Sequence, residues 1–117
     1  MADYSKTRIT DGKRTELHDV LSLTGAEISI NILEPGTGTP FVHAHRKNEE
    51  IYGVVGGRGK IVLDGEDVSL EKGDWLRVDP CVKRQIFSAS DSALEYICIQ
   101  AKAGSLEGFT MNDGFLC

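Results

Sequence analysis

Residues 40–59 read PFVHAHRKNEEIYGVVGGRG, and the spacing of the polar side chains is the main feature of this stretch. His43 and His45 are separated by one residue, and Glu50 follows five positions after the second histidine. Alternate side chains of a β-strand project from one face, so we expect both imidazoles to point to one place. Two nitrogens and one carboxylate oxygen suit a divalent ion. The stretch therefore predicts a metal site formed by these three residues.

Short strands separated by turns are expected along most of the chain. Ile28, Ile30 and Ile32 alternate with polar residues, as in a half-buried strand, and Asp64-Gly65 is typical of a hairpin turn. Only residues 16–23 and 105–108 have a weak helical pattern. The regular spacing of the expected strands and turns predicts an all-β sandwich or barrel. The expected strands cover residues 28–32, 41–45, 50–55, 59–63, 68–71, 75–78, 83–88 and 94–100.

The stretch from Pro40 to Gly59 resembles the first conserved motif of the cupin superfamily. In that motif HxH is followed by three or four residues, a Glu, six residues and a Gly. Glu49 fits the shorter spacing and Glu50 the longer one. We favour Glu50 as the ligand because it directly precedes the apolar run of residues 51–55, and we expect Glu49 to be solvated.

The resemblance implies a small jelly-roll barrel of two packed antiparallel sheets. We expect residues 1–117 to form a single domain, with the barrel at about 28–100, an N-terminal arm at 1–27 and a C-terminal tail at 101–117. A chain of this length buries enough surface for one core. The tail is apolar, and many cupins associate in pairs, so the resemblance also implies a homodimer.

The second cupin motif is matched less well, by Gly73 to Ser88. Arg84 stands where the third histidine ligand of the family belongs, and a guanidinium has no lone pair to give to a metal. Two roles for Arg84 follow. Beside a divalent transition metal such as Fe, Mn, Ni or Zn, it would help to bind a small anionic molecule. Without a metal, it would pair with Glu50 across the pocket.

These two roles give two function classes. The first is a metal site that binds an anion and catalyses an oxygenase or isomerase reaction. The second is a metal-free module that binds a sugar or small acid without turnover, and an inert pocket with a structural role is a third. Tyr52 and Tyr96 are expected either to face the cavity and bind substrate or to pack in the core.

Composition excludes several other classes. The net charge is −5, and no cluster of Lys and Arg offers a surface for nucleic acid. The three Cys have no CxxC spacing, which favours a reducing compartment. We see no signal-peptide pattern, and no apolar run approaches the roughly 18 residues that a membrane span requires. We therefore expect a cytoplasmic protein without nucleic-acid or membrane partners.

Overall fold

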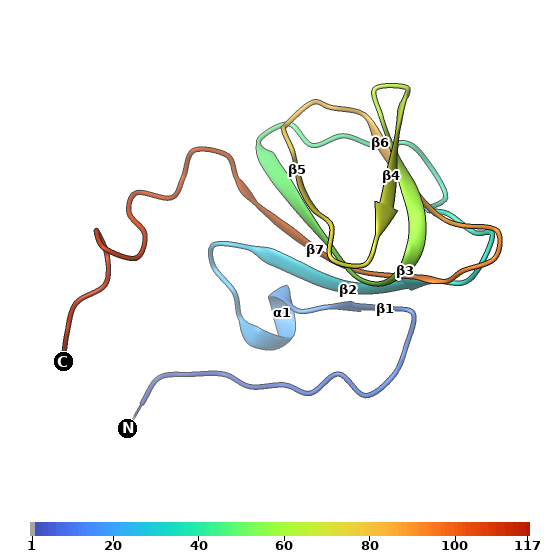
Figure 1. Cartoon of the computed structure of the whole chain (residues 1–117). Coiled ribbons are helices and arrows are strands. Elements are labelled where there is room, and N and C mark those ends of the chain that lie inside the picture. Colours follow the sequence, from blue (N-terminus) through green and yellow to red (C-terminus); the bar gives the residue numbers. More distant parts are fainter. Residues whose placement is uncertain (1) are drawn as a thin grey trace.

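The computed structural model describes residues 2–117, and its regular secondary structure is almost entirely antiparallel strand (Figure 1). One short helix interrupts them near the N-terminus. The elements are β1 (Arg14–Glu16), α1 (His18–Leu21), β2 (Glu27–Leu33), β3 (Asn48–Leu63), β4 (Glu66–Glu71), β5 (Trp75–Val78), β6 (Arg84–Ser88) and β7 (Leu94–Lys102). The all-β prediction is confirmed.

The long strand β3 organises the sheet. Its first half lies between β5 and β7, and its second half lies between β4 and β6. Beyond β7 the sheet continues through β2 to β1. Figure 1 shows the sheet curling, so that β4, β5 and β6 lie over β2 and β7. Within the described residues the hydrogen-bonded path does not close on itself, so the two-sheet barrel stays a prediction.

A bulge and a glycine allow β3 to turn between its two halves. The register with β7 shifts between Val54 and Gly56, which leaves Val55 outside the ladder and 43% exposed. Gly57 follows with a φ of 77°, and a Cβ at this position would collide with the carbonyl oxygen of Ala93. Only glycine fits here. The separate expected strands 50–55 and 59–63 are therefore one continuous, bent strand.

The core lies inside the curl and follows the alternation of the strands. Val54, Ile61 and Leu94 are at most 2% exposed, and other apolar side chains pack around them. The whole buried set is Tyr52, Val54, Ile61, Leu70, Val78, Ile86, Leu94, Tyr96 and Cys98. Asp64 and Gly65, both with positive φ, form the predicted hairpin between β3 and β4.

Three local predictions are wrong. Residues 41–45 form no strand, because His43 makes only an isolated bridge to Arg84. Residues 105–108 are not helical. The helical pattern of 16–23 contracts to the four residues of α1, and β1 precedes it as a short strand that we did not expect.

The two ends of the chain extend away from the sheet (Figure 1). The radius of gyration is 15.8 Å, compared with about 13 Å for a compact chain of this length. In the tail, Phe109, Phe115 and Leu116 are 68%, 86% and 101% exposed, so its apolar surface does not pack on the sheet. No helix in residues 2–117 is long and apolar enough to span a bilayer.

Candidate metal centre

Backbone hydrogen bonds hold the two histidines in place although they lie outside any strand. The His43 amide donates to the carbonyl of Arg84, and the Arg84 amide donates back to His43. The Cys81 amide donates to the carbonyl of His45 over 2.7 Å. These bonds fasten the loop to β6 and to the turn before it. The two imidazoles are therefore presented on one side, as expected, but by a loop instead of a strand.

Glu50 reaches the same place from β3, and it is the carboxylate that joins the two histidines. Its Oε2 lies 3.2 Å from His45 Nε2, and its Oε1 lies 3.9 Å from His43 Nε2. One donor atom from each of the three residues lies within 4.8 Å of the others. Glu50 is 4% exposed, whereas Glu49 alternates to the other face and takes no part in the cluster.

The donor set fits a divalent transition metal. A metal ion sits about 2.0–2.2 Å from His nitrogen and carboxylate oxygen, so two donors of one ion lie at most about 4.2 Å apart. The two measured separations from Glu50, 3.2 and 3.9 Å, fall within that limit. The His43 and His45 rings are edge to face, with centroids 5.3 Å apart. Small side-chain movements would therefore suffice to place an ion between the three donors.

Arg84 contacts the carboxylate that would bind the ion. Its Nη1 donates to Glu50 Oε1 over 2.8 Å, and the side chain is 1% exposed. Its Nε and Nη2 donate to the backbone carbonyls of Val82 and Asp79. The guanidinium therefore holds Glu50 and the loop before β6, which is the contact expected of its second role. Little of its donor capacity remains for a ligand.

The two oxygens of Glu50 have different partners. Oε1 accepts from Arg84 and from the Tyr52 hydroxyl at 2.7 Å, whereas Oε2 faces His45 and the Cys98 thiol at 3.4 Å. Burial alone would raise the pKa of Glu50, but the hydrogen bonds from Tyr52 and Arg84 lower it below its usual value. The carboxylate is therefore ionised, with Oε2 directed at His45 and Oε1 on the side of His43.

Burial controls the protonation of the side chains in the site. Partial burial lowers the pKa of His43, against the attraction of Glu50, so the neutral imidazole is favoured. Burial raises the pKa of the Tyr52 hydroxyl and of the Cys98 thiol, which stay protonated. Burial also raises the pKa of Tyr96, to about 12.

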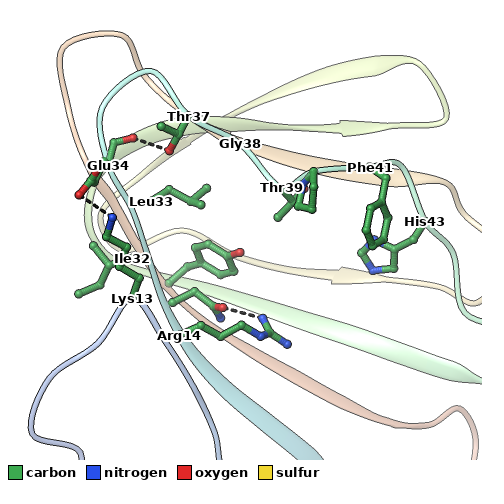
Figure 2. Close-up of a pocket in the computed structure, with 13 residues that line it drawn as sticks. Lys13, Arg14, Ile32, Leu33, Glu34, Thr37, Gly38, Thr39, Phe41 and His43 are labelled. Atoms are coloured by element: carbon green, nitrogen blue, oxygen red, sulfur yellow. Dashed lines mark hydrogen bonds and ion pairs between the residues drawn. The ribbon is translucent and has the colours of Figure 1, made fainter.

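Two cavities that share lining residues adjoin the cluster. The inner one, of about 170 Å³, is lined by the three candidate ligands together with Tyr52, Arg84, Tyr96 and Cys98. The outer one, of about 690 Å³, is drawn in Figure 2 and opens beside His43. Arg14, Thr39, His43 and Tyr96 line both cavities.

Cys98 and Arg14 are site residues that we did not predict. Cys98 stands opposite Tyr52 in the β3–β7 register, so both side chains point into the inner cavity. Strand alternation from Glu50 would have suggested Tyr52, but its cross-strand partner depends on a register that the sequence does not specify. Arg14 lies on β1, which has no apolar pattern.

The sequence and the fold are similar to those of known proteins. The family model described as Cupin domain matches residues 30–100. The chain belongs to the cupin family. This cupin is similar to a cupin protein of Bacteroides fragilis, with 56% identity and a TM-score of 0.96 over 100% of this chain and 99% of that one.

More distant relatives cover less of the chain. A predicted oxalate decarboxylase of Thermotoga maritima is 25% identical, with a TM-score of 0.60 over 64% of each chain. An uncharacterized protein of Methanocaldococcus jannaschii is 33% identical over 57 residues, which are 49% of this chain and 46% of that protein. The match thus spans less than half the length of this curated relative.

Proposed function

We propose that this cupin binds a divalent transition metal through His43, His45 and Glu50, and that the metal-bound site takes up a small anionic molecule. The observation that carries the proposal is the convergence of three donor atoms within 4.8 Å, on a buried carboxylate and two half-buried imidazoles. Two His and one carboxylate leave open positions on an ion such as Fe, Mn, Ni or Zn.

Charge supports the choice of an anion. A divalent ion with one carboxylate carries a net charge of about +1, and the Arg84 guanidinium raises the local charge to about +2. The inner cavity is too buried for water to screen this charge fully. An anion that enters the site offsets the excess and is oriented by it. In this proposal Arg84 acts mainly by positioning Glu50, while Tyr52 and Tyr96 line the space that the ligand enters.

The proposed chemistry is an oxygenase or isomerase reaction. A bound ion would act there as a Lewis acid with free coordination positions. The residues of this chain would hold the ion, keep Tyr52 and Tyr96 protonated beside it, and limit the entry of water. The similarity to a predicted oxalate decarboxylase is consistent with a small acid as the ligand. A cytoplasmic homodimer remains part of the proposal.

A second candidate is a metal-free module that binds a sugar or small acid without turnover. The ion pair between Arg84 and Glu50 favours it, because both groups are buried and each satisfies the other without a metal. In this alternative the guanidinium takes the place of the ion.

Elemental analysis of the protein purified without added metal separates the two candidates. We expect a stoichiometric transition metal in the wild type, its loss in His43→Ala, and its retention in His18→Ala. His18 is a suitable control because it is exposed and lies outside the cluster. If wild-type protein that is stably folded contains no metal and takes up none on dialysis against Zn, Mn, Ni or Fe(II), the metal site is refuted and the metal-free alternative is supported.

A further inference from the structure

The outer cavity has a structure that indicates which anion the site takes. Its walls are the end of β2, the loop of residues 37–41, and β1. We propose that it binds an amphipathic monocarboxylate, with the carboxylate paired to Arg14 beside His43 and the apolar part lying against Leu33 and Phe41. The inference deepens the proposed function and rests on it, since it places the ligand beside the same three metal-binding residues.

Arg14 is the cation that this cavity offers to a ligand. Its Nη1 donates to the Asn31 side chain over 2.7 Å, and its Nε makes only a long contact of 3.4 Å with the exposed Glu16. Within residues 2–117 its Nη2 donates no hydrogen bond. The Asn31 contact orients the guanidinium without neutralising it. A carboxylate therefore finds a preoriented, charged donor.

The other charged groups of the cavity cancel each other. Lys13 Nζ lies 2.8 Å from Glu34 Oε1, so these two residues form an ion pair (Figure 2). Among the Lys, Arg, Asp and Glu side chains of the lining, Arg14 is then the one left without an opposite charge inside the cavity. A single negative charge on the ligand is thus matched, whereas a dianion would have only one free cationic partner in this cavity.

Most of the remaining lining is apolar. Leu33 is half-buried, and Phe41 is 66% exposed although it faces the cavity (Figure 2). Pro40 and the Tyr96 ring add to the same wall. A volume of about 690 Å³ is in the range of small-molecule sites, well above the need of a two-carbon acid. Burial of a hydrocarbon or aromatic group here contributes binding free energy that a fully polar ligand does not gain.

The cavity depends on a residue outside the part of the chain that matches the cupin family model. Arg14 belongs to β1, outside the residues 30–100 that match the family model. β1 is held by its pairing with β2, which places Arg14 directly opposite Asn31. This short strand therefore supplies both a wall of the cavity and its cation, so it acts as a specificity element.

Titration calorimetry with matched ligands tests the inference on the full-length protein. The probes are phenylacetate, 3-phenylpropionate and hexanoate, each paired with its alcohol, and acetate as an anion without an apolar part. We expect each amphipathic acid to bind more tightly than its alcohol and than acetate. Arg14→Gln should weaken the binding of the acids by roughly tenfold or more and leave the alcohols unchanged, because a charge-assisted hydrogen bond is lost.

The control is Arg58→Gln. Arg58 is an exposed arginine with a similar accessibility, 54% against 56%, but it pairs with Asp91 outside this cavity. We expect it to bind the acids as the wild type does, and Arg14→Lys to retain part of the affinity. Phe41→Ser should weaken the amphipathic acids and leave acetate unaffected. Unchanged melting temperatures would exclude unfolding as the cause.

Several results would overturn the inference. Equal binding of the acids and their alcohols would contradict it, as would equal losses in Arg14→Gln and Arg58→Gln. Binding that appears only on dilution of the protein would mean that a second copy covers the cavity. The titrations are repeated on metal-free and metal-loaded protein. If the protein takes up no metal but binds the acids through Arg14, the proposed metal site is refuted and the carboxylate site stands. If it takes up metal but shows no Arg14-dependent binding, the carboxylate site is refuted and the metal site stands.

Discussion

Replacement of Arg84 by methionine is the sharpest test of how the site is held together. In the wild type Nη1 of Arg84 lies 2.8 Å from Glu50 Oε1, and the two side chains are 1% and 5% exposed. At an effective dielectric of about 20, their attraction is about 6 kcal/mol, much of which offsets desolvation. Without the guanidinium, Glu50 is a buried carboxylate that lacks a compensating charge. We expect a loss of about 3–5 kcal/mol in the free energy of unfolding near neutral pH.

The loss in the free energy of unfolding of Arg84→Met should depend on pH. In the variant, burial raises the pKa of Glu50 above the ordinary value of 4.5, so the folded protein protonates it instead of burying its charge. That protonation costs about 1.4 kcal/mol for each pH unit above 4.5, or about 4 kcal/mol at pH 7.5 and about 1.4 kcal/mol at pH 5.5. A group with a raised folded-state pKa loses stability as the pH rises. The loss should therefore shrink by up to about 2.7 kcal/mol between pH 7.5 and 5.5, the full amount applying where the folded-state pKa exceeds 7.5.

Urea unfolding of metal-free protein at the two pH values measures this difference. Arg58→Met is the matched control, because Arg58 pairs with Asp91 at the same 2.8 Å but with both side chains exposed. We expect it to cost less than about 1 kcal/mol at either pH. The double variant Glu50→Gln/Arg84→Met should lose the pH dependence. An Arg84→Met loss that is the same at both pH values, or no larger than that of Arg58→Met, would refute the reasoning.

Four further predictions concern the same molecule. Arg84→His should bind divalent metal more tightly in titration calorimetry, because it adds a ligand and removes a charge; unchanged affinity would place Arg84 beyond the reach of the ion. The pKa of His43 is lowered, so metal-free protein should lose stability as the pH falls below 6.5, and His43→Gln should reduce that loss in thermal melts. A thiol reagent should modify Cys81 and Cys117 in the native protein but Cys98 only after unfolding, since Cys98 is buried and its pKa is raised. Light scattering should give the mass of a dimer, because the apolar tail is exposed in one copy; a monomeric mass would contradict this.

The fold was predictable where strands are long and paired along their length. The strand at residues 28–32 and the Asp64-Gly65 turn appear in the structure at the expected places, but Ser29 and Asn31, instead of the isoleucines, form the buried face of β2. Residues 41–45 have the alternation of a strand and lie beside β6, but only His43 pairs with that strand, through an isolated bridge to Arg84. β1 has three polar residues, and its pairing with β2 is the reason that it is a strand. Sequence periodicity detects a strand by its continuous buried face, and neither residues 41–45 nor β1 has such a face.

The site was predictable to the extent that its residues are close in the sequence. His43, His45 and Glu50 lie within one loop and the strand that follows, so their spacing indicated that they converge, and the apolar run after Glu50 favoured it over Glu49. The contact of Arg84 with Glu50 joins residues 34 positions apart, so the sequence alone left two roles for Arg84 open. The positions of Cys98 and Arg14 in the site likewise depend on strand registers, of β7 with β3 and of β1 with β2.

The two oxygens of Glu50 explain how, in the proposed metal site, an arginine could occupy the place of a ligand and still leave room for an ion. Arg84 and Tyr52 both donate to Oε1, and this fixes the rotation of the carboxylate group. Oε2 is then directed at His45, where an ion would need it. The arginine takes no coordination position and adds one positive charge behind the carboxylate. A site of this kind gives up some affinity for a cation in exchange for attraction of an anion. Arg14, at the junction of the two cavities, adds to the same attraction.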